Sequence, residues 1–184
     1  FLNTKKHKVE IFLGKKANKY KNKSDGNNQV KKSIYENTKN IVFKNCKSDN
    51  DFVLVLQSDA VFSNKDKVLK GINIAEDFLI KNKDIDMFML GYHPNIVYNN
   101  TNNSKIIKIN YAIHWQSVIL RKSLFEKYPE IPYGIHSDVY LASKMENNIV
   151  CYGLKEPIFK QDIGRYIRRK FEYSIFYNLR CKFR

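Results

Sequence analysis

The sequence predicts an α/β fold, in which a mixed, mostly parallel sheet is flanked by helices. Two runs of strand length carry this prediction, Val53–Leu56 and the mostly apolar Ile85–Gly91. A run without polar alternation indicates a strand that is buried on both faces, as in the interior of an α/β sheet. Residues 30–46 and 65–81 carry apolar side chains at helical spacing, which predicts helices that cover the sheet.

The first half of the chain divides into strand, loop, helix, strand and helix. Val9–Leu13 is a short strand closed by Gly14, and the polar, basic stretch 15–29 is a loop with a turn signal at Asp25-Gly26. The first helix, 30–46, places Ile34, Ile41, Val42 and Cys46 on one face. Ser63 or Asn64 caps the second helix, whose apolar residues form a single stripe.

The second half contains shorter elements. In chain order they are an Asn-rich loop over 95–104, an edge strand over 105–112, a strand over 115–120, a helix over 123–128, a helix from 137 to 145, and closing strands over 149–153 and 157–159. Residues 163–184 mix aromatic side chains with Arg and Lys, which is typical of an interfacial amphipathic helix. We therefore expect one domain over 1–162, followed by a basic aromatic tail over 163–184.

Composition limits the class of protein. The chain has 184 residues, 43% of them hydrophobic and 14% aromatic, which fits one globular domain with its own core. The net charge of +15 favours anionic partners, either nucleotide phosphates, nucleic acid or an anionic membrane surface. A nucleic-acid-binding protein is one alternative, which the net charge and the basic aromatic residues 163–184 favour. Against it, the basic residues are dispersed and form no recognised nucleic-acid-binding motif, so we do not expect a nucleic-acid partner.

The cysteines and the apolar stretches bear on location. Cys46, Cys151 and Cys181 are widely spaced and odd in number, which indicates free thiols in a reducing compartment. No apolar stretch reaches the roughly 18–20 residues that cross a bilayer, and there is no signal peptide. We expect a cytoplasmic protein whose tail contacts a membrane peripherally. Because the chain begins with Phe1 rather than Met, we also expect it to be a piece of a longer protein.

Asp59 is the first candidate site residue, because it follows the buried strand 53–56. Ligands of open α/β sheets bind beyond the carboxyl ends of the strands. A carboxylate at that edge can hold a divalent cation or a sugar hydroxyl. The alternative is an aspartate that only closes the strand as a turn or cap.

Several segments from Ser33 to Asp162 together resemble glycosyltransferase family 25, the lipopolysaccharide-biosynthesis and collagen-galactosyltransferase type, which has a GT-A scaffold. The segment 52–60, Phe-Val-Leu-Val-Leu-Gln-Ser-Asp-Ala, is similar to the family's strand ending in Glu-Asp-Asp-Ala or Glu-Asp-Asp-Val. Asp86–Gly91 resembles its Asp-x-x-x-Leu-Gly strand, and Trp115–Arg121 resembles the strand before its acceptor-side helix. The matching segments 135–141 and 157–162 resemble its Asp-x-x-Leu segment and its Pro, apolar and Gln segment.

The resemblance implies a GT-A, Rossmann-like enzyme that moves a sugar from a nucleoside-diphosphate donor to a glycan or protein acceptor, assisted by Mn²⁺ or Mg²⁺. Asp59 is then a metal or ribose ligand, with Gln57 beside it at the donor. Val9–Leu13 resembles the family's second strand, so we expect the opening strand, which holds the base, to be absent from these residues. The family's paired carboxylates are replaced by Gln57-Ser58-Asp59, so one alternative is a degenerate transferase that only binds.

Four further residues complete the expected site. Asp138 is the expected base that takes the proton of the acceptor hydroxyl, since backbone N–H groups at a helix start hold a carboxylate in place and ionised. His136 is a candidate metal ligand, and Gln161 a candidate hydrogen-bond donor to the donor sugar. Arg165 is expected to fold over the diphosphate. The alternative is that Asp138 only caps the helix, and that Gln161 and Arg165 belong to an ordinary solvated surface.

Overall fold

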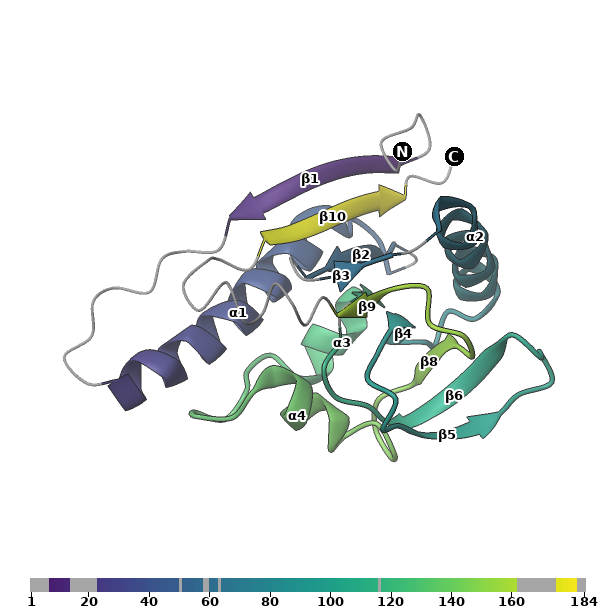
Figure 1. Cartoon of the computed structure of the whole chain (residues 1–184). Coiled ribbons are helices and arrows are strands. Elements are labelled where there is room, and N and C mark those ends of the chain that lie inside the picture. The colour runs from purple at the N-terminus through teal and green to yellow at the C-terminus, as the bar shows by residue number, and fades with distance from the viewer. Residues whose placement is uncertain are drawn as a thin grey trace.

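The computed structural model describes residues 7–13, 23–49, 51–57, 60–62, 64–115, 117–161 and 175–181. These residues form an α/β structure (Figure 1). The helices are α1 (Lys23–Asn45), α2 (Lys65–Lys81), α3 (Lys122–Lys127) and α4 (Ser137–Ala142). The strands are β1 (His7–Leu13), β2 (Val53–Leu56), β3 (Ala60–Val61), β4 (Met87–Gly91), β5 (Val97–Asn100), β6 (Ile106–Tyr111), β7 (Ser117–Leu120), β8 (Cys151–Leu154), β9 (Lys160–Gln161) and β10 (Ile175–Cys181).

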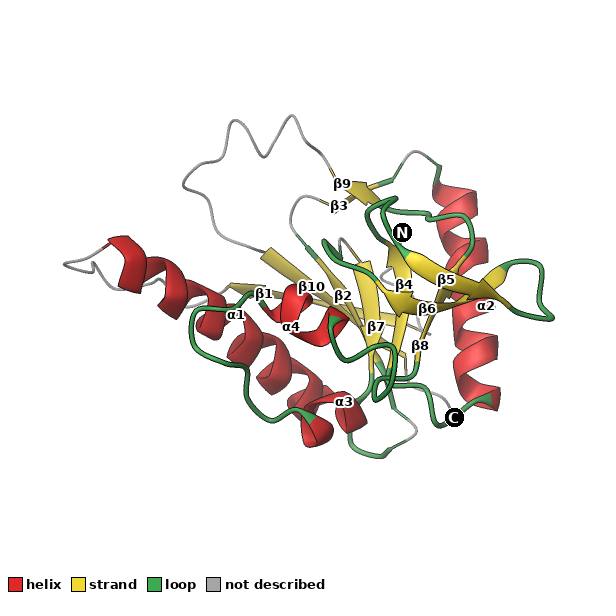
Figure 2. Cartoon of the chain, turned by 90° about the horizontal axis from the view of Figure 1, so that it is seen from below, coloured by secondary structure: helices red, strands yellow, loops and turns green. Residues whose placement is uncertain are grey.

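The main sheet has the strand order β1-β10-β2-β7-β4-β8-β6-β5, and β3 pairs with β9 in a small second sheet. Among the described strands of the main sheet, β4 and β8 form the only parallel pair, and the other six neighbouring pairs are antiparallel. The expectation of a mostly parallel sheet was therefore wrong. The sheet is mixed and mostly antiparallel, and its helices lie on both faces (Figure 2).

Strand β7 shows why the apolar runs led to a wrong prediction of strand direction. Its four residues are all buried, as in β2 and β4, yet it runs antiparallel to both of these neighbours. An uninterrupted apolar strand reports burial on two faces, and parallel sheets are only the commonest cause of such burial. Helices on both faces of this sheet produce the same pattern for antiparallel strands.

Alternate residues of the central strands face two separate cores. Val53 and Val55 of β2 belong to the core under α1, α3 and α4, together with Tyr35 and Leu141. Leu54 and Leu56 belong to the core under α2. The second core includes the α2 stripe Val68, Ile72, Ala75 and Leu79. Each face of the sheet is thus closed by its own helical layer (Figure 2).

Helix α2 follows its sequence prediction at both ends. The Asn64 side chain accepts a hydrogen bond from the Lys67 backbone N–H at 2.9 Å, which satisfies one of the free N–H groups of the first turn. The apolar stripe is buried on the sheet. At the other end, the Asn82 backbone N–H donates to the Phe78 carbonyl at 3.1 Å and closes the last turn.

Other elements differ from their predictions. Helix α1 begins at Lys23, so it runs through the Asp25-Gly26 turn signal and much of the predicted loop. Local propensity is a weak preference that the rest of a helix can override. The predicted loop 95–104 contains β5, so β6 is not the sheet edge that its pattern predicted. The helix expected to reach residue 145 ends at Ala142. In the tail, residues 175–181 form β10 rather than a helix, and β10 inserts between β1 and β2.

A buried polar cluster joins the amino end of β4 to α3 and β8. The Asp86 carboxylate accepts hydrogen bonds from the Ser123 hydroxyl at 2.7 Å, the Lys127 ammonium at 2.7 Å and the Val150 backbone N–H at 3.0 Å. Arg121, 2% exposed, donates to the Leu79 carbonyl at 2.6 Å and the Asp49 carbonyl at 3.0 Å. These bonds fix the end of the sheet opposite the candidate site described next.

Candidate functional site

One edge of the main sheet gathers the ends of four strands. Strands β2 and β4 both run antiparallel to β7, which lies between them, and β8 runs parallel to β4. The carboxyl ends of β2, β4 and β8 therefore meet at the edge where β7 begins. This is the type of edge at which α/β proteins bind ligands. Gln57 directly follows β2 at this edge.

Asp138 reaches the same edge from the first turn of α4. Leu141 is buried in the core and anchors this short helix against the sheet. The preceding segment is tied to α1, since the Lys31 ammonium donates to the Gly134 carbonyl at 2.9 Å and the Tyr35 hydroxyl donates to the Tyr128 carbonyl. Gly134 has φ +83, a conformation that side chains with a Cβ rarely adopt.

The Asp138 carboxylate is fixed by two backbone N–H groups. One oxygen accepts from the N–H of His114 at 3.1 Å, and the other from the N–H of Val139 at 2.9 Å. The Asp138 side chain is 22% exposed, so solvent and ligands reach it. The structure thus holds this carboxylate oriented and accessible, as the prediction for a general base requires.

One histidine lies beside Asp138, and a second lies beside the first. The His114 Nδ1 atom is 3.9 Å from Asp138 Oδ2, and the His114 ring lies 5.9 Å, centroid to centroid, from the His93 ring. His114 has φ +55, in the left-handed region that residues other than glycine adopt only uncommonly. The His93 Nδ1 atom accepts a hydrogen bond from the Asn95 N–H at 3.2 Å. The three side chains form a continuous group that the sequence did not link, because 24 residues separate His114 from Asp138.

His93 also lines a hollow at this edge, which we call the strand-edge cavity. Its volume is about 650 Å³. It is lined by Tyr92, His93, Pro94, Ile96, Tyr98, Ile107, Lys155, Pro157, Lys160 and Gln161. Aromatic and apolar walls with a few polar groups are typical of small-molecule sites. The two lysines give this cavity a positive character, which suits a phosphate-bearing ligand.

Tyr92 forms the fixed wall of the strand-edge cavity. Its hydroxyl donates to the Leu154 carbonyl at 2.6 Å, which joins the end of β4 to the end of β8. Burial raises the pKa of Tyr92 to about 12, and the nearby Tyr98 adds to the rise. The hydroxyl therefore stays protonated and engaged with the backbone at neutral pH.

Gln161 and Gln57 both lie at this edge, but in different hollows. Gln161 is in β9, which pairs with β3 just beyond β2, and its side chain lines the strand-edge cavity. Gln57 lines a smaller cavity of about 50 Å³ together with Trp115 and Ser137. The end of β2 and the start of α4 are thus neighbours.

The remaining predicted residues are less well placed or lie outside the described part of the chain. His136 is exposed at the amino end of α4 and makes no side-chain capping bond there. Asp59 and Arg165 lie outside the described residues, so their roles stay predictions. Lys155 and Lys160 were not predicted, because single lysines in a Lys-rich chain carry no signal in the sequence.

The donor set for a metal is incomplete among the residues that the structure describes. They contain no group of three or more His, Cys, Asp and Glu side chains suited to a metal ion. His136 therefore has no described partners with which to form a metal site. Binding of Mn²⁺ or Mg²⁺ at Asp59 stays a prediction.

No helix within the described ranges combines the length and the apolar character needed to cross a membrane.

Comparisons with known proteins identify no relative. No family model matches the chain, and neither the curated proteins nor the solved structures include a significant match.

Proposed function

We propose that this protein is a glycosyltransferase that moves a sugar from a nucleoside-diphosphate donor to a glycan or protein acceptor. The observation that carries the proposal is the position of Asp138. Its oriented carboxylate contacts His114, and His114 stacks edge-on against a histidine that lines the strand-edge cavity. The resemblance of the segments around β2, β4, β7 and α4 to glycosyltransferase family 25 supports the same assignment.

In the proposed reaction, the acceptor hydroxyl attacks the anomeric carbon of the donor sugar. Its proton passes to the Asp138 carboxylate, a new C–O bond forms, and the bond between the sugar and the diphosphate breaks. The electron pair of that bond leaves with the nucleoside diphosphate. Lys155 and Lys160, in the wall of the cavity, stabilise the added negative charge on the leaving group.

The other lining residues bind and orient the donor. Gln161 offers both a hydrogen-bond donor and an acceptor to sugar hydroxyls. Tyr92 and Tyr98 supply flat apolar surface against which a sugar or a base packs. The cationic side chains Lys155 and Lys160 supply charge stabilisation in this proposal, and a Mn²⁺ or Mg²⁺ ion held at Asp59 would add to it.

The test is turnover of a panel of nucleotide sugars by the purified chain, with Mn²⁺, with Mg²⁺ and with a chelator, followed by mass spectrometry. We expect release of nucleoside diphosphate from at least one donor. Asp138→Asn keeps the size of the side chain and removes the base, and should reduce kcat by about 10²- to 10⁴-fold. Asp77→Asn, which changes an exposed carboxylate on α2, is the matched control and should leave kcat unchanged.

Two outcomes would replace the proposal. Binding of a nucleoside diphosphate without turnover of any donor would assign the chain as a degenerate transferase that only binds. Salt-dependent binding of single-stranded RNA or DNA, without binding of any nucleotide sugar, would assign it as a nucleic-acid-binding protein. Equal kcat in Asp138→Asn and the wild type would reject Asp138 as the base.

A further inference from the structure

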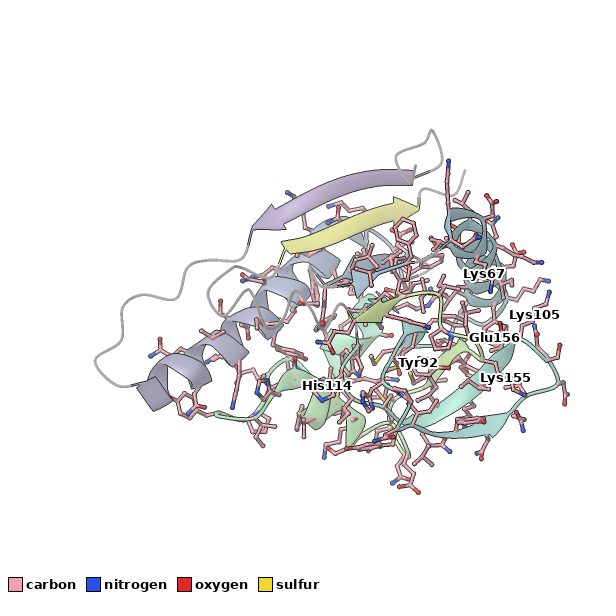
Figure 3. The ribbon with its side chains drawn as sticks, viewed as in Figure 1. Lys67, Tyr92, Lys105, His114, Lys155 and Glu156 are labelled. Atoms are coloured by element: carbon pink, nitrogen blue, oxygen red, sulfur yellow. The ribbon has the colours of Figure 1, made fainter. Side chains whose placement is uncertain are left out.

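A second hollow lies on the face of the sheet covered by α2, apart from Asp138 and the histidines. It has a volume of about 330 Å³ and lies between α2 and the segments that flank β6 and β8. Four lysines line it, Lys67, Lys70, Lys105 and Lys155, and Glu156 is the one acidic residue of its wall. We call it the lysine cavity. Figure 3 shows Lys67, Lys105 and Lys155 gathered on one side of the molecule around Glu156.

The fold forces these four charges together. Lys67 and Lys70 are three residues apart in α2, a spacing that places side chains on the same side of a helix. Lys105 and Lys155 lie next to each other, because the Lys155 backbone N–H donates to the Lys105 carbonyl at 2.9 Å beside the Ile106–Leu154 pair of β6 and β8. Neighbouring like charges repel one another in both settings.

The described residues do not neutralise these lysines by ion pairs. The ion pairs found among them involve Lys39, Lys122, Lys127 and His114 instead. The Lys155 ammonium contacts a neutral partner, the side-chain oxygen of Asn100, at 3.4 Å. With Glu156 as the one carboxylate of the wall, the lining keeps an excess of three positive charges, four from lysine minus one.

The floor of the lysine cavity is apolar and tightly built. Ile158 is fixed by its backbone N–H, which donates to the Leu90 carbonyl at 2.8 Å. Its side chain reaches Gly71 of α2 so closely that a Cβ there would lie 2.7 Å from Ile158 Cδ1. The floor also includes Ile74, Leu154 and Pro157. A concave, partly apolar site beneath several cations fits a compact ligand with more than one negative charge.

We propose that the lysine cavity binds a ligand bearing a diphosphate or a terminal phosphate monoester, as a second site next to the strand-edge cavity, with which it shares Lys155 and Pro157. Phosphate oxygens accept charge-assisted hydrogen bonds from ammonium groups, and a multiply charged group satisfies several lysines at once. Two sources offer this chemistry, a soluble phosphorylated metabolite and a phosphorylated lipid headgroup. The proposal does not depend on transferase activity.

The test measures binding to the whole chain by calorimetry with inorganic pyrophosphate, and by co-sedimentation with vesicles of equimolar phosphatidylcholine and phosphatidic acid. The variant Lys67→Gln/Lys105→Gln removes two charges from the cavity and leaves Lys155, which also lines the strand-edge cavity, in place. Lys81→Gln/Lys83→Gln removes two exposed charges at the other end of α2, one from its last residue and one just beyond it, and is the control for net charge.

We expect the cavity variant to weaken binding at least about tenfold, which corresponds to about 1.4 kcal/mol, and the control variant to retain wild-type binding. Binding of pyrophosphate identifies a soluble ligand, and binding of the vesicles alone identifies a lipid headgroup. The proposal is overturned if neither probe binds, or if both variants weaken binding equally, because the effect would then be that of net charge.

Discussion

The Asp86 carboxylate, whose side chain has no exposed surface, lies 2.7 Å from the ammonium nitrogen of Lys127, whose side chain is 44% exposed. The ion pair therefore has one buried and one half-solvated end. Ser123 and the Val150 backbone N–H complete the hydrogen bonds of the buried carboxylate. This cluster holds α3 and the start of β8 against β4, at the end of the sheet away from the candidate site.

Replacement of Asp86 should destabilise the whole fold. Asp86→Ala leaves the Val150 N–H and the Ser123 hydroxyl without their acceptor and removes the partner of Lys127. We expect the free energy of unfolding to fall by about 1–3 kcal/mol, the cost of leaving a buried polar group without its partner, because the half-exposed ammonium of Lys127 returns to water. Urea denaturation followed by circular dichroism measures this loss. Asp84→Ala, at an exposed turn position two residues earlier, is the control and should cost less than about 1 kcal/mol.

The buried tyrosines should make the protein less stable in alkali. The phenol of Tyr92 has a pKa of about 12 in the folded chain, raised from 10.0 mainly by burial. A raised folded-state pKa means that this stabilisation is complete below pH 10 and is lost as the pH rises toward 12. We expect the free energy of unfolding to fall over that interval. Tyr92→Phe should flatten the decline, and an equally steep decline in this variant would reject the assignment.

The thiol of Cys151 should be inert in the native protein. It is fully buried, and burial, with a smaller contribution from Asp86, raises its pKa well above that of a free thiol. The thiolate is the reactive species, so alkylation has to wait for local unfolding. At pH 8 we expect iodoacetamide to label Cys151 at least about a hundredfold more slowly in the native chain than in urea. Peptide mass spectrometry gives both rates, and similar rates would show that the core around β8 opens readily.

Gly91, at the end of β4, should tolerate no side chain. A Cβ at this position would lie 2.7 Å from the Phe159 backbone oxygen and 2.8 Å from Ser117 Oγ, and the backbone oxygen cannot move aside cheaply. We expect Gly91→Ala to cost about 1–3 kcal/mol and to displace the chain that leads to Gln161. Gly71→Ala is the matched control, because its Cβ would meet the movable side-chain ends of Ile158 and Leu154. A melting temperature that falls as far for Gly71→Ala as for Gly91→Ala would contradict this prediction.

Lys160 should matter for the proposed transfer reaction. If it stabilises the leaving diphosphate, Lys160→Gln should lower kcat/KM for the donor by about tenfold or more, since a hydrogen bond to a charged group contributes about 1.5–3 kcal/mol. Lys108→Gln changes an exposed lysine of β6 outside the strand-edge cavity and is the control. Steady-state kinetics with a fixed acceptor measure both. Equal losses in the two variants would indicate a general effect of charge.

Local signals predicted the elements that depend on local chemistry. Helix α2 was predicted from its first residue to its last, because the Asn64 cap and the apolar stripe both lie within the segment itself. The central strands β2 and β4 were predicted because two-sided burial leaves an uninterrupted apolar run. Their direction was not predicted, since the same burial arises for parallel and antiparallel neighbours.

Features that depend on distant pairing were missed. Strand β5 is exposed along its whole length and carries no apolar pattern, and its turn is formed by the Thr101 hydroxyl, which donates to the Ile106 carbonyl at 2.7 Å. Strand β10 pairs with β2, more than a hundred residues earlier in the chain. No local pattern encodes such a pairing, and the basic aromatic composition of the tail favoured a helix instead.

The candidate site was predicted in part. Gln57, Asp138 and Gln161 all come to one edge of the sheet: Gln57 follows β2, Asp138 lies in the first turn of α4, and Gln161 ends β9. The contact of Asp138 with His114 was not predictable, since it depends on the positive φ of His114 and on the packing of α4. The role of Asp59 stays a prediction from sequence, because that residue lies outside the described part of the chain.

Strand β5 ends the sheet, and no described strand covers its outer side. Val97 and Tyr98 are 57% and 44% exposed there, so this edge offers both backbone groups and hydrophobic side chains to another molecule. Mutual repulsion between copies carrying a charge of +15 keeps such edges apart in dilute buffer. Salt shortens the range of that repulsion from about 10 Å at 0.1 M to about 3 Å at 1 M. High salt concentration should therefore favour aggregation of this protein through its exposed β5 edges, and purification is best kept at low ionic strength.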